Sequence, residues 1–260
     1  LDRYGLIVDK TMNEETEDDE LLHKEAQKEA SREMKWIEMT HNWKKVKPKV
    51  LKRRILKGIP DGMRSLAWRL ILDPESQDLS VYDSRPQIPT LVAQGRDPCC
   101  NTIEVDLPRT MPQMDIFHKE ESIGSLRSIL HAFSNYDKEL GYTQGMAFYA
   151  ALLLCYMEER QSFWCFAYLM KGDNHLLREV FIPPFPGLFN LYKVWDCALK
   201  MKFKKVHAKF EKIKLPPEMY VPSWFMCNFL NSGFPMDVKL RLFDAYSYYG
   251  TRSTFSFCFT

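Results

Sequence analysis

Two short polar motifs interrupt the apolar pattern of this chain, and each holds one residue suited to act on a reacting phosphate. The first is Ile103-Glu-Val-Asp106-Leu-Pro-Arg109-Thr110, and the second is Tyr142-Thr-Gln144-Gly145-Met146. The guanidinium of Arg109 and the carboxamide of Gln144 do not exchange protons near neutral pH, so neither suits a nucleophile or a general base. A guanidinium can stabilise negative charge and a carboxamide can orient water. Phosphoryl transfer leaves these two tasks to protein side chains once a metal ion and a phosphate cradle are in place.

Each of these two residues also has a purely structural interpretation. Arg109 could simply pair with Asp106, and Gln144 could satisfy backbone groups at the start of the helix that follows. If Arg109 acts on a phosphate, Asp106 becomes the group that orients its guanidinium. In that case Gly145 lets the backbone approach a partner without a Cβ atom, and Tyr142 offers a flat amphipathic contact.

A third motif lies upstream, in the segment that contains Arg54, Gly58, Pro60, Arg64 and Trp68. Taken in this order, the three motifs resemble the TBC domain, the GTPase-activating module for Rab-type small GTPases. The resemblance covers roughly residues 50 to 250 and continues through residues 139–142, 162–164 and 235–244.

The resemblance implies specific roles for the two reactive residues. Arg109 matches the arginine finger and Gln144 the glutamine finger that the family donates to a GTP-bound Rab. GTP and Mg²⁺ are then held by the Rab, so no cofactor and no metal are expected in this chain. Asp106, Thr110, Tyr142 and Gly145 are expected as supporting residues. Thr143 stands where the family often has cysteine.

Arg64 and Trp68 are one helical turn apart, and a neighbouring arginine and tryptophan at this spacing are typical of packing with charge satisfaction. We therefore interpret them as residues that shape the domain and border the partner surface.

Composition and cysteine usage limit the class of protein. The chain has 260 residues, 45% of them hydrophobic, which is ample for a buried core, and its formal charge of +2 favours neither nucleic acid nor membrane as a global partner. Seven scattered cysteines without a CxxC motif indicate reduced thiols, hence a cytoplasmic protein, recruited to the cytosolic face of endomembranes if its partner is a Rab. Cys99 and Cys100 are expected to be exposed free thiols. The histidines form no ligand cluster.

The chain is expected to divide into a charged helical extension, residues 1–50, and a TBC domain, residues 51–260. The extension's helix follows the acidic run 14–20 and reaches about Trp43. Its expected apolar stripe is Leu22, Ala26, Ala30, Met34 and Ile37. Between Lys44 and Lys57 there are eight basic residues and no acid, and we place the boundary in this stretch.

The remaining pattern predicts an all-α fold, since no segment shows sustained strand alternation. Residues 73–101 are expected to form a long surface connection with one short helix. The helices expected after Pro60 lie near 60–70, 123–136, 146–157, 161–171, 186–200, 203–213, 217–230 and 237–249. In 203–213 the expected apolar stripe is Phe203, Val206, Phe210 and Ile213, with lysines on the other faces.

The C-terminal end is expected to lack the last helices of the family. The helix 237–249 has apolar groups on more than one face. With no second partner for it, we expect exposed apolar surface around Leu240 and Phe243.

Three classes of function compete. The leading one is a Rab GTPase-activating protein. The second is a catalytically weak TBC scaffold that binds a Rab or another trafficking partner, and the presence of both Arg109 and Gln144 argues against it. The third is a basic module for RNA or anionic membrane, suggested by Lys44 to Lys57 and the lysines at 200–214. The lack of a recognisable nucleic-acid motif argues against RNA, and membrane contact through Lys44 to Lys57 competes with simple solvated charge.

Overall fold

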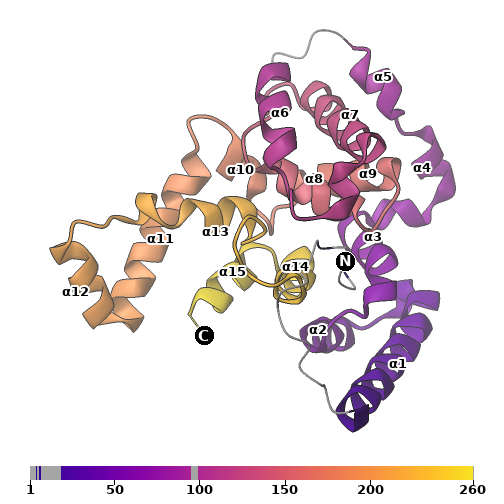
Figure 1. The fold of residues 1–260 in the computed structure, drawn as a ribbon, viewed down its shortest axis with the longest axis horizontal. Coiled ribbons are helices and arrows are strands. Elements are labelled where there is room, and N and C mark those ends of the chain that lie inside the picture. The colour runs from indigo at the N-terminus through magenta and orange to yellow at the C-terminus, as the bar shows by residue number, and fades with distance from the viewer. Residues whose placement is uncertain (1–3, 5, 7–18, 95–98, 260) are drawn as a thin grey trace.

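The structure, a computed structural model, describes residues 4, 6, 19–94 and 99–259, and its regular elements are helices (Figure 1). Within these residues the only β pairing is an isolated bridge between Leu6 and Met114. The predicted all-α class is confirmed. None of the helices in this described part of the chain has the length and apolar character that crossing a bilayer requires.

The α-helices in chain order are α1 (Asp19–His41), α2 (Pro48–Lys57), α3 (Arg64–Leu72), α4 (Leu79–Ser84), α5 (Ile88–Val92), α6 (Cys100–Asp106), α7 (Glu120–Tyr136), α8 (Met146–Leu154), α9 (Glu159–Lys171), α10 (Leu177–Phe181), α11 (Pro186–Lys202), α12 (Lys204–Lys212), α13 (Pro222–Cys227), α14 (Met236–Tyr249) and α15 (Thr251–Cys258). Short 3₁₀ turns are η1 (Trp43–Lys45), η2 (Asp61–Met63), η3 (Pro74–Gln77), η4 (Leu107–Arg109), η5 (Asp115–His118) and η6 (Pro217–Met219).

Helix α8 lies at the centre of the larger hydrophobic core. Its sequence is apolar on every side, as predicted for a buried helix, and only Phe148 and Leu154 are partly exposed. Helices α7 and α9 pack on it (Figure 1). Phe133 of α7 meets Phe166 of α9 edge to face at 4.8 Å between ring centroids, a geometry that aromatic pairs prefer.

Helix α1 forms as predicted, but its predicted apolar stripe is wrong. Ala26, Ala30, Met34 and Ile37 are exposed, and the side chain of Leu22 lies outside the described residues. The helix instead buries Trp36 and Met39, one turn apart near its C-terminal end, in the same core as α8. The physical reason is that the face of α1 turned toward the domain carries Trp36 and Met39 and not the predicted stripe. The predicted division at residue 51 stays a prediction.

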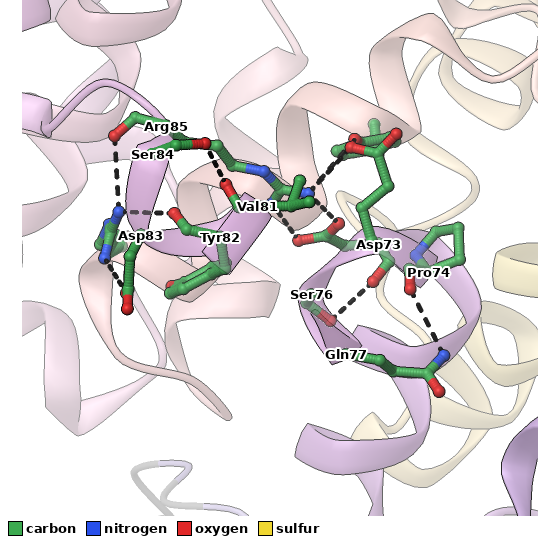
Figure 2. A network of polar contacts seen from close by, with 12 residues as sticks. Asp73, Pro74, Ser76, Gln77, Val81, Tyr82, Asp83, Ser84 and Arg85 are labelled. Carbon is green, nitrogen blue, oxygen red and sulfur yellow. Dashed lines mark hydrogen bonds and ion pairs between the residues drawn. The ribbon is translucent and has the colours of Figure 1, made fainter. Parts of the chain in front are cut away.

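The segment 73–101 is more ordered than predicted. It contains α4 and α5, and Ile88 and Leu91 of α5 are buried beneath α7. Arg85, between these helices, binds the carboxylate of Asp73 through both Nη atoms, at 2.6 and 2.8 Å (Figure 2). Because this pair is nearly dry and bidentate, it fixes the segment on the domain. Residues 95–98 lie outside the described part.

The expected exposed surface at the C-terminal end is wrong. Leu240 and Phe243 are fully buried, because α14 packs on α2 and α3 and also on α15. The sequence pattern did not predict α15. The Gly250 turn before it has φ of +61°, and a Cβ there would lie 1.9 Å from the carbonyl oxygen of Asn174.

A buried carboxylate, Asp244 of α14, holds the start of the domain. It accepts hydrogen bonds from the backbone N–H of Ile59 at 3.3 Å, from Arg64 Nε at 3.2 Å and from Trp68 Nε1 at 3.0 Å. Burial raises the pKa of Asp244 to about 6, against the opposing effects of Arg64 and the other donors, so the group is ionised at neutral pH. Arg64 and Trp68 therefore pack α3 against α14, as expected for residues that shape the domain, and the border position predicted for them at a partner surface stays a prediction.

Replacing Asp244 with alanine should lower the free energy of unfolding by roughly 3–5 kcal/mol, since it leaves the buried guanidinium of Arg64 without its main counter-charge. Urea denaturation followed by tryptophan fluorescence measures the loss. The matched control is Asp237→Ala, an exposed aspartate in the first turn of the same helix, with an expected loss below about 1 kcal/mol. Equal losses in the two variants would contradict the role given to Asp244.

Candidate functional site

The carboxylate of Asp106 joins the two polar motifs. Its Oδ1 accepts a hydrogen bond from Arg109 Nε at 2.7 Å and a second, shorter one from Arg109 Nη2. Its Oδ2 accepts a hydrogen bond from the hydroxyl of Tyr142 at 2.5 Å. Asp106 itself is buried. The Arg109 motif and the Gln144 motif are therefore held to each other by one charged group.

The first motif positions Arg109 at the surface by burying its neighbours. Ile103 of α6 and Leu107 of η4 are both in the core, so the chain is anchored on either side of Asp106. The hydroxyl of Thr110 donates to the backbone carbonyl of Asp106 at 2.8 Å, which satisfies an acceptor at the end of α6. Because the interior side of this turn is filled, the side chain of Arg109 points outward and stays 49% exposed.

The pairing leaves part of the guanidinium available. Asp106 binds the N–H of Nε and one N–H of Nη2, and the described residues supply no further partner to Arg109. The Nη1 amino group and the second N–H of Nη2 remain as donors. The structural interpretation, a pair with Asp106, and the functional one, an oriented donor, are thus compatible in one geometry.

Tyr142 is a part of this support and not the partner contact that we expected. The residue is buried, and its hydroxyl points at Asp106. Burial, together with this hydrogen bond, raises the pKa of the Tyr142 hydroxyl far above its ordinary value. The hydroxyl therefore stays protonated and donates to the carboxylate at any physiological pH.

Gln144 lies on the loop before α8 with its side chain exposed, and no described residue makes a hydrogen bond with it. The loop is fixed on both sides of it. Thr143 donates its hydroxyl to the carbonyl of Phe181 at 3.1 Å. Gly145 has φ of +103°, and a Cβ atom there would lie 3.2 Å from Cys227 Sγ. We expected glycine here for the approach of a partner, but Gly145 is buried and faces the interior.

Lys239 is a residue of this site that the sequence pattern did not reveal. It lines a cleft of about 480 Å³ together with Arg109, Phe148 and Phe234. The residue is only 4% exposed, and its ammonium group has no ion-pair or hydrogen-bond partner among the described residues. Burial lowers the pKa of its ammonium group. An anionic group entering the cleft would meet two cationic side chains, Arg109 and Lys239.

Cys99 is a second residue with an unforeseen role. It is half-buried, and its Sγ accepts a hydrogen bond from the backbone N–H of Tyr142 at 3.3 Å, while Cys100 is exposed as expected. Among the described residues, no group of three or more His, Cys, Asp or Glu side chains is placed to hold a metal ion.

The sequence matches the family model described as Rab-GTPase-TBC domain over residues 61–260. The chain belongs to this family. Among curated proteins, this TBC domain is 30% identical over 225 residues to the human ecotropic viral integration site 5 protein homolog. It is 30% identical over 227 residues to the Rab GTPase-activating protein eat-17 of Caenorhabditis elegans, and 31% identical over 214 residues to the GTPase-activating protein GYP5 of Saccharomyces cerevisiae.

These matches cover 85%, 86% and 80% of the chain but only 27%, 24% and 22% of the respective relatives. Two solved structures share the fold. The Ypt/Rab-GAP domain of Gyp1p has a TM-score of 0.69 at 17% identity, over 85% of this chain and 80% of that one. The Chlamydomonas flagellar RabGAP TBC domain has a TM-score of 0.73 at 20% identity, over 99% and 83%.

Replacing Tyr142 with phenylalanine should lower the free energy of unfolding of this TBC domain by about 1–3 kcal/mol, because the buried Asp106 loses a donor. Thermal or urea denaturation measures the change. Tyr248→Phe is the matched control, since the Tyr248 hydroxyl makes no hydrogen bond within the described residues, and it should leave stability nearly unchanged. A Tyr142→Phe protein as stable as the control would show that the Asp106 contact contributes nothing.

Proposed function

We propose that this TBC domain accelerates GTP hydrolysis by a Rab-type GTPase, and that it supplies Arg109 and Gln144 to the partner's GTP site. One observation carries the proposal: both side chains are exposed, and their motifs are joined by the buried carboxylate of Asp106. The names of two matched relatives, a Rab GTPase-activating protein and a GTPase-activating protein, support it. Acceleration of single-turnover GTP hydrolysis, measured across a panel of Rab proteins, is the direct test.

In this proposal Arg109 acts by charge. Its free N–H groups meet the oxygens of the γ-phosphoryl group, where negative charge spreads in the transition state. Asp106 holds the guanidinium before the partner arrives, so less rotational freedom is lost when the complex forms. A residue of this kind contributes about 10³ to 10⁵ in rate.

Gln144 acts on the attacking water. A carboxamide carries both a donor and an acceptor, so it can hold the water in line with the phosphorus atom while contacting the partner. Its place on a loop anchored through Thr143 and Gly145 supports such a task, because water must be aimed within a small angle. GTP and Mg²⁺ belong to the Rab, in its GTP-bound form, and this chain needs no cofactor of its own.

The place of action in this proposal is the cytoplasm, at the cytosolic face of an endomembrane that carries the lipidated Rab. The segment Lys44 to Lys57 is suited to a peripheral contact there, since most of its basic side chains are exposed. Clustered positive charge is attracted to anionic lipids at the cytoplasmic leaflet.

Arg109→Ala and Arg109→Lys should both reduce activation by at least about 10³, since a lysine ammonium cannot reproduce the planar donor set. Single-turnover hydrolysis by the cognate Rab is the measurement. Arg127→Ala is a matched control, because Arg127 is also a partly exposed arginine paired with a carboxylate, Glu104, at 2.8 Å. It should keep full activity. A lysine variant with near wild-type activity would refute the role of Arg109.

Gln144→Ala should slow hydrolysis about 10²-fold or more while leaving Rab binding nearly intact, because its task is exerted on water in the transition state. The sharper assay uses a Rab whose own switch glutamine is replaced. Wild-type protein and the control Gln87→Ala, an exposed glutamine just before α5 that does not line the cleft beside Arg109, should still activate that Rab. Failure of the wild-type protein to do so would mean that the Rab uses its own glutamine.

A further inference from the structure

Helix α12 carries exposed apolar side chains far from the site. In Figure 1 the helix lies at the left edge of the molecule, whereas α6 and α8 lie to the right of centre. The predicted apolar stripe is divided: Phe210 is half-buried against the smaller core around Trp195, whereas Val206 is 41% exposed and Ile213, the residue that follows the helix, is 58% exposed. The residue that α12 buries is His207, which pairs with Asp196 and Glu211 at 3.2 and 3.4 Å. Val206 and Ile213 therefore do not serve the core.

The two apolar side chains lie on the same side of the helix. Val206 and Ile213 are seven residues apart, which is nearly two full turns, so one lies almost directly above the other. Lys209 lies between them in sequence and about a sixth of a turn away around the axis. Lys202 is exposed at the end of α11, beside the corner that leads into α12. The surface is thus an apolar row edged by ammonium groups.

Positive charge is concentrated on this part of the chain. Residues 200 to 214 contain seven lysines and one glutamate, a formal charge of +6, whereas the whole chain carries +2. All seven lysines are exposed, and within the described chain none of them is paired with a carboxylate. The lysines are Lys200, Lys202, Lys204, Lys205, Lys209, Lys212 and Lys214.

The combination of side chains selects among anionic partners. Nucleic acid binding favours arginine and aromatic rings that stack on bases, but the positive residues here are all lysine, and Phe203 is already stacked on Phe259 at 5.9 Å. Lysine with aliphatic side chains is the pattern of helices that lie in a bilayer interface, where long stems let the ammonium groups reach the headgroups.

We propose that the outer face of α12 docks on an anionic phospholipid bilayer, with Val206 and Ile213 entering the boundary between headgroups and acyl chains and the surrounding lysines binding the headgroups. This surface is independent of Arg109 and Gln144. It differs from the contact proposed for Lys44 to Lys57, which rests on charge, because α12 adds an apolar anchor.

Vesicle co-sedimentation of the whole chain tests this, with phosphatidylcholine vesicles that do or do not contain phosphatidylserine. We expect binding to the anionic vesicles only. Val206→Ser with Ile213→Ser should weaken it about tenfold or more, since two aliphatic side chains no longer leave water. Replacing Lys205, Lys209 and Lys212 with glutamine should weaken it similarly, and added salt should weaken it in the wild type.

Leu56→Ser is the matched control, because Leu56 is 63% exposed within the other basic segment. It should bind anionic vesicles as the wild type does. Circular dichroism and activation of a Rab in solution check that the α12 variants are folded. The proposal is overturned if the Val206 and Ile213 variant binds like the wild type, if Leu56→Ser carries the loss instead, or if the wild-type chain prefers RNA or an acidic peptide to anionic vesicles.

Discussion

The hydrogen-bonded carboxylate of Asp244 is the constraint on which the arrangement of this domain depends. It binds groups from residues 59 to 68, about 180 residues earlier in the chain, so it joins α14 to α3 and to the segment just before α3. Closing so long a loop costs entropy, and the contact can be stable only when the intervening helices are packed. Because α14 is thereby fixed on α3, its first turn holds Lys239 at the wall of the cleft beside Arg109.

Asp106 makes the same kinds of contact as Asp244, but the arginine that it binds is more exposed to solvent. In each case a buried aspartate binds an arginine and one aromatic side chain. The Arg64 side chain is 7% exposed, so its charge is neutralised inside the protein by Asp244, whereas about half of the Arg109 side chain faces solvent. A dry pair resists any competing anion, but a half-exposed pair keeps free N–H donors and a fixed direction. Whether an arginine is structural or available to a partner thus depends on how far the surrounding residues cover its guanidinium group.

Local patterns predicted the elements whose burial follows from their own sequence. α7, α8 and α9 were expected because their apolar spacing is complete within each helix. The stripe predicted on α1 was wrong, and the one on α12 was right only for Phe210, which packs on the smaller core while Val206 is exposed. A helix buries only the face that meets a neighbour, and residue spacing does not say where the neighbour lies. At the site, Arg109 and Gln144 came from motifs. The Asp106–Tyr142 bond joins residues 36 apart, and Lys239 breaks the usual rule that lysine is exposed, so neither had a local signal.

The molecule has two hydrophobic clusters, and this explains how α11 and α12, here called the α12 arm, can serve a different surface from the site. The residues that anchor Arg109 belong to the larger cluster, with Ile103, Leu107 and Tyr142 among them. The arm has its own cluster around Trp195, built from α10, α11 and α13, and Phe259 stacks on Trp195 at 4.8 Å. Interiors transmit strain through close packing, so a change confined to the outer side of α12 meets the smaller core first. A bilayer could thus hold the arm while a GTPase engages Arg109, because neither contact needs the other's core to repack.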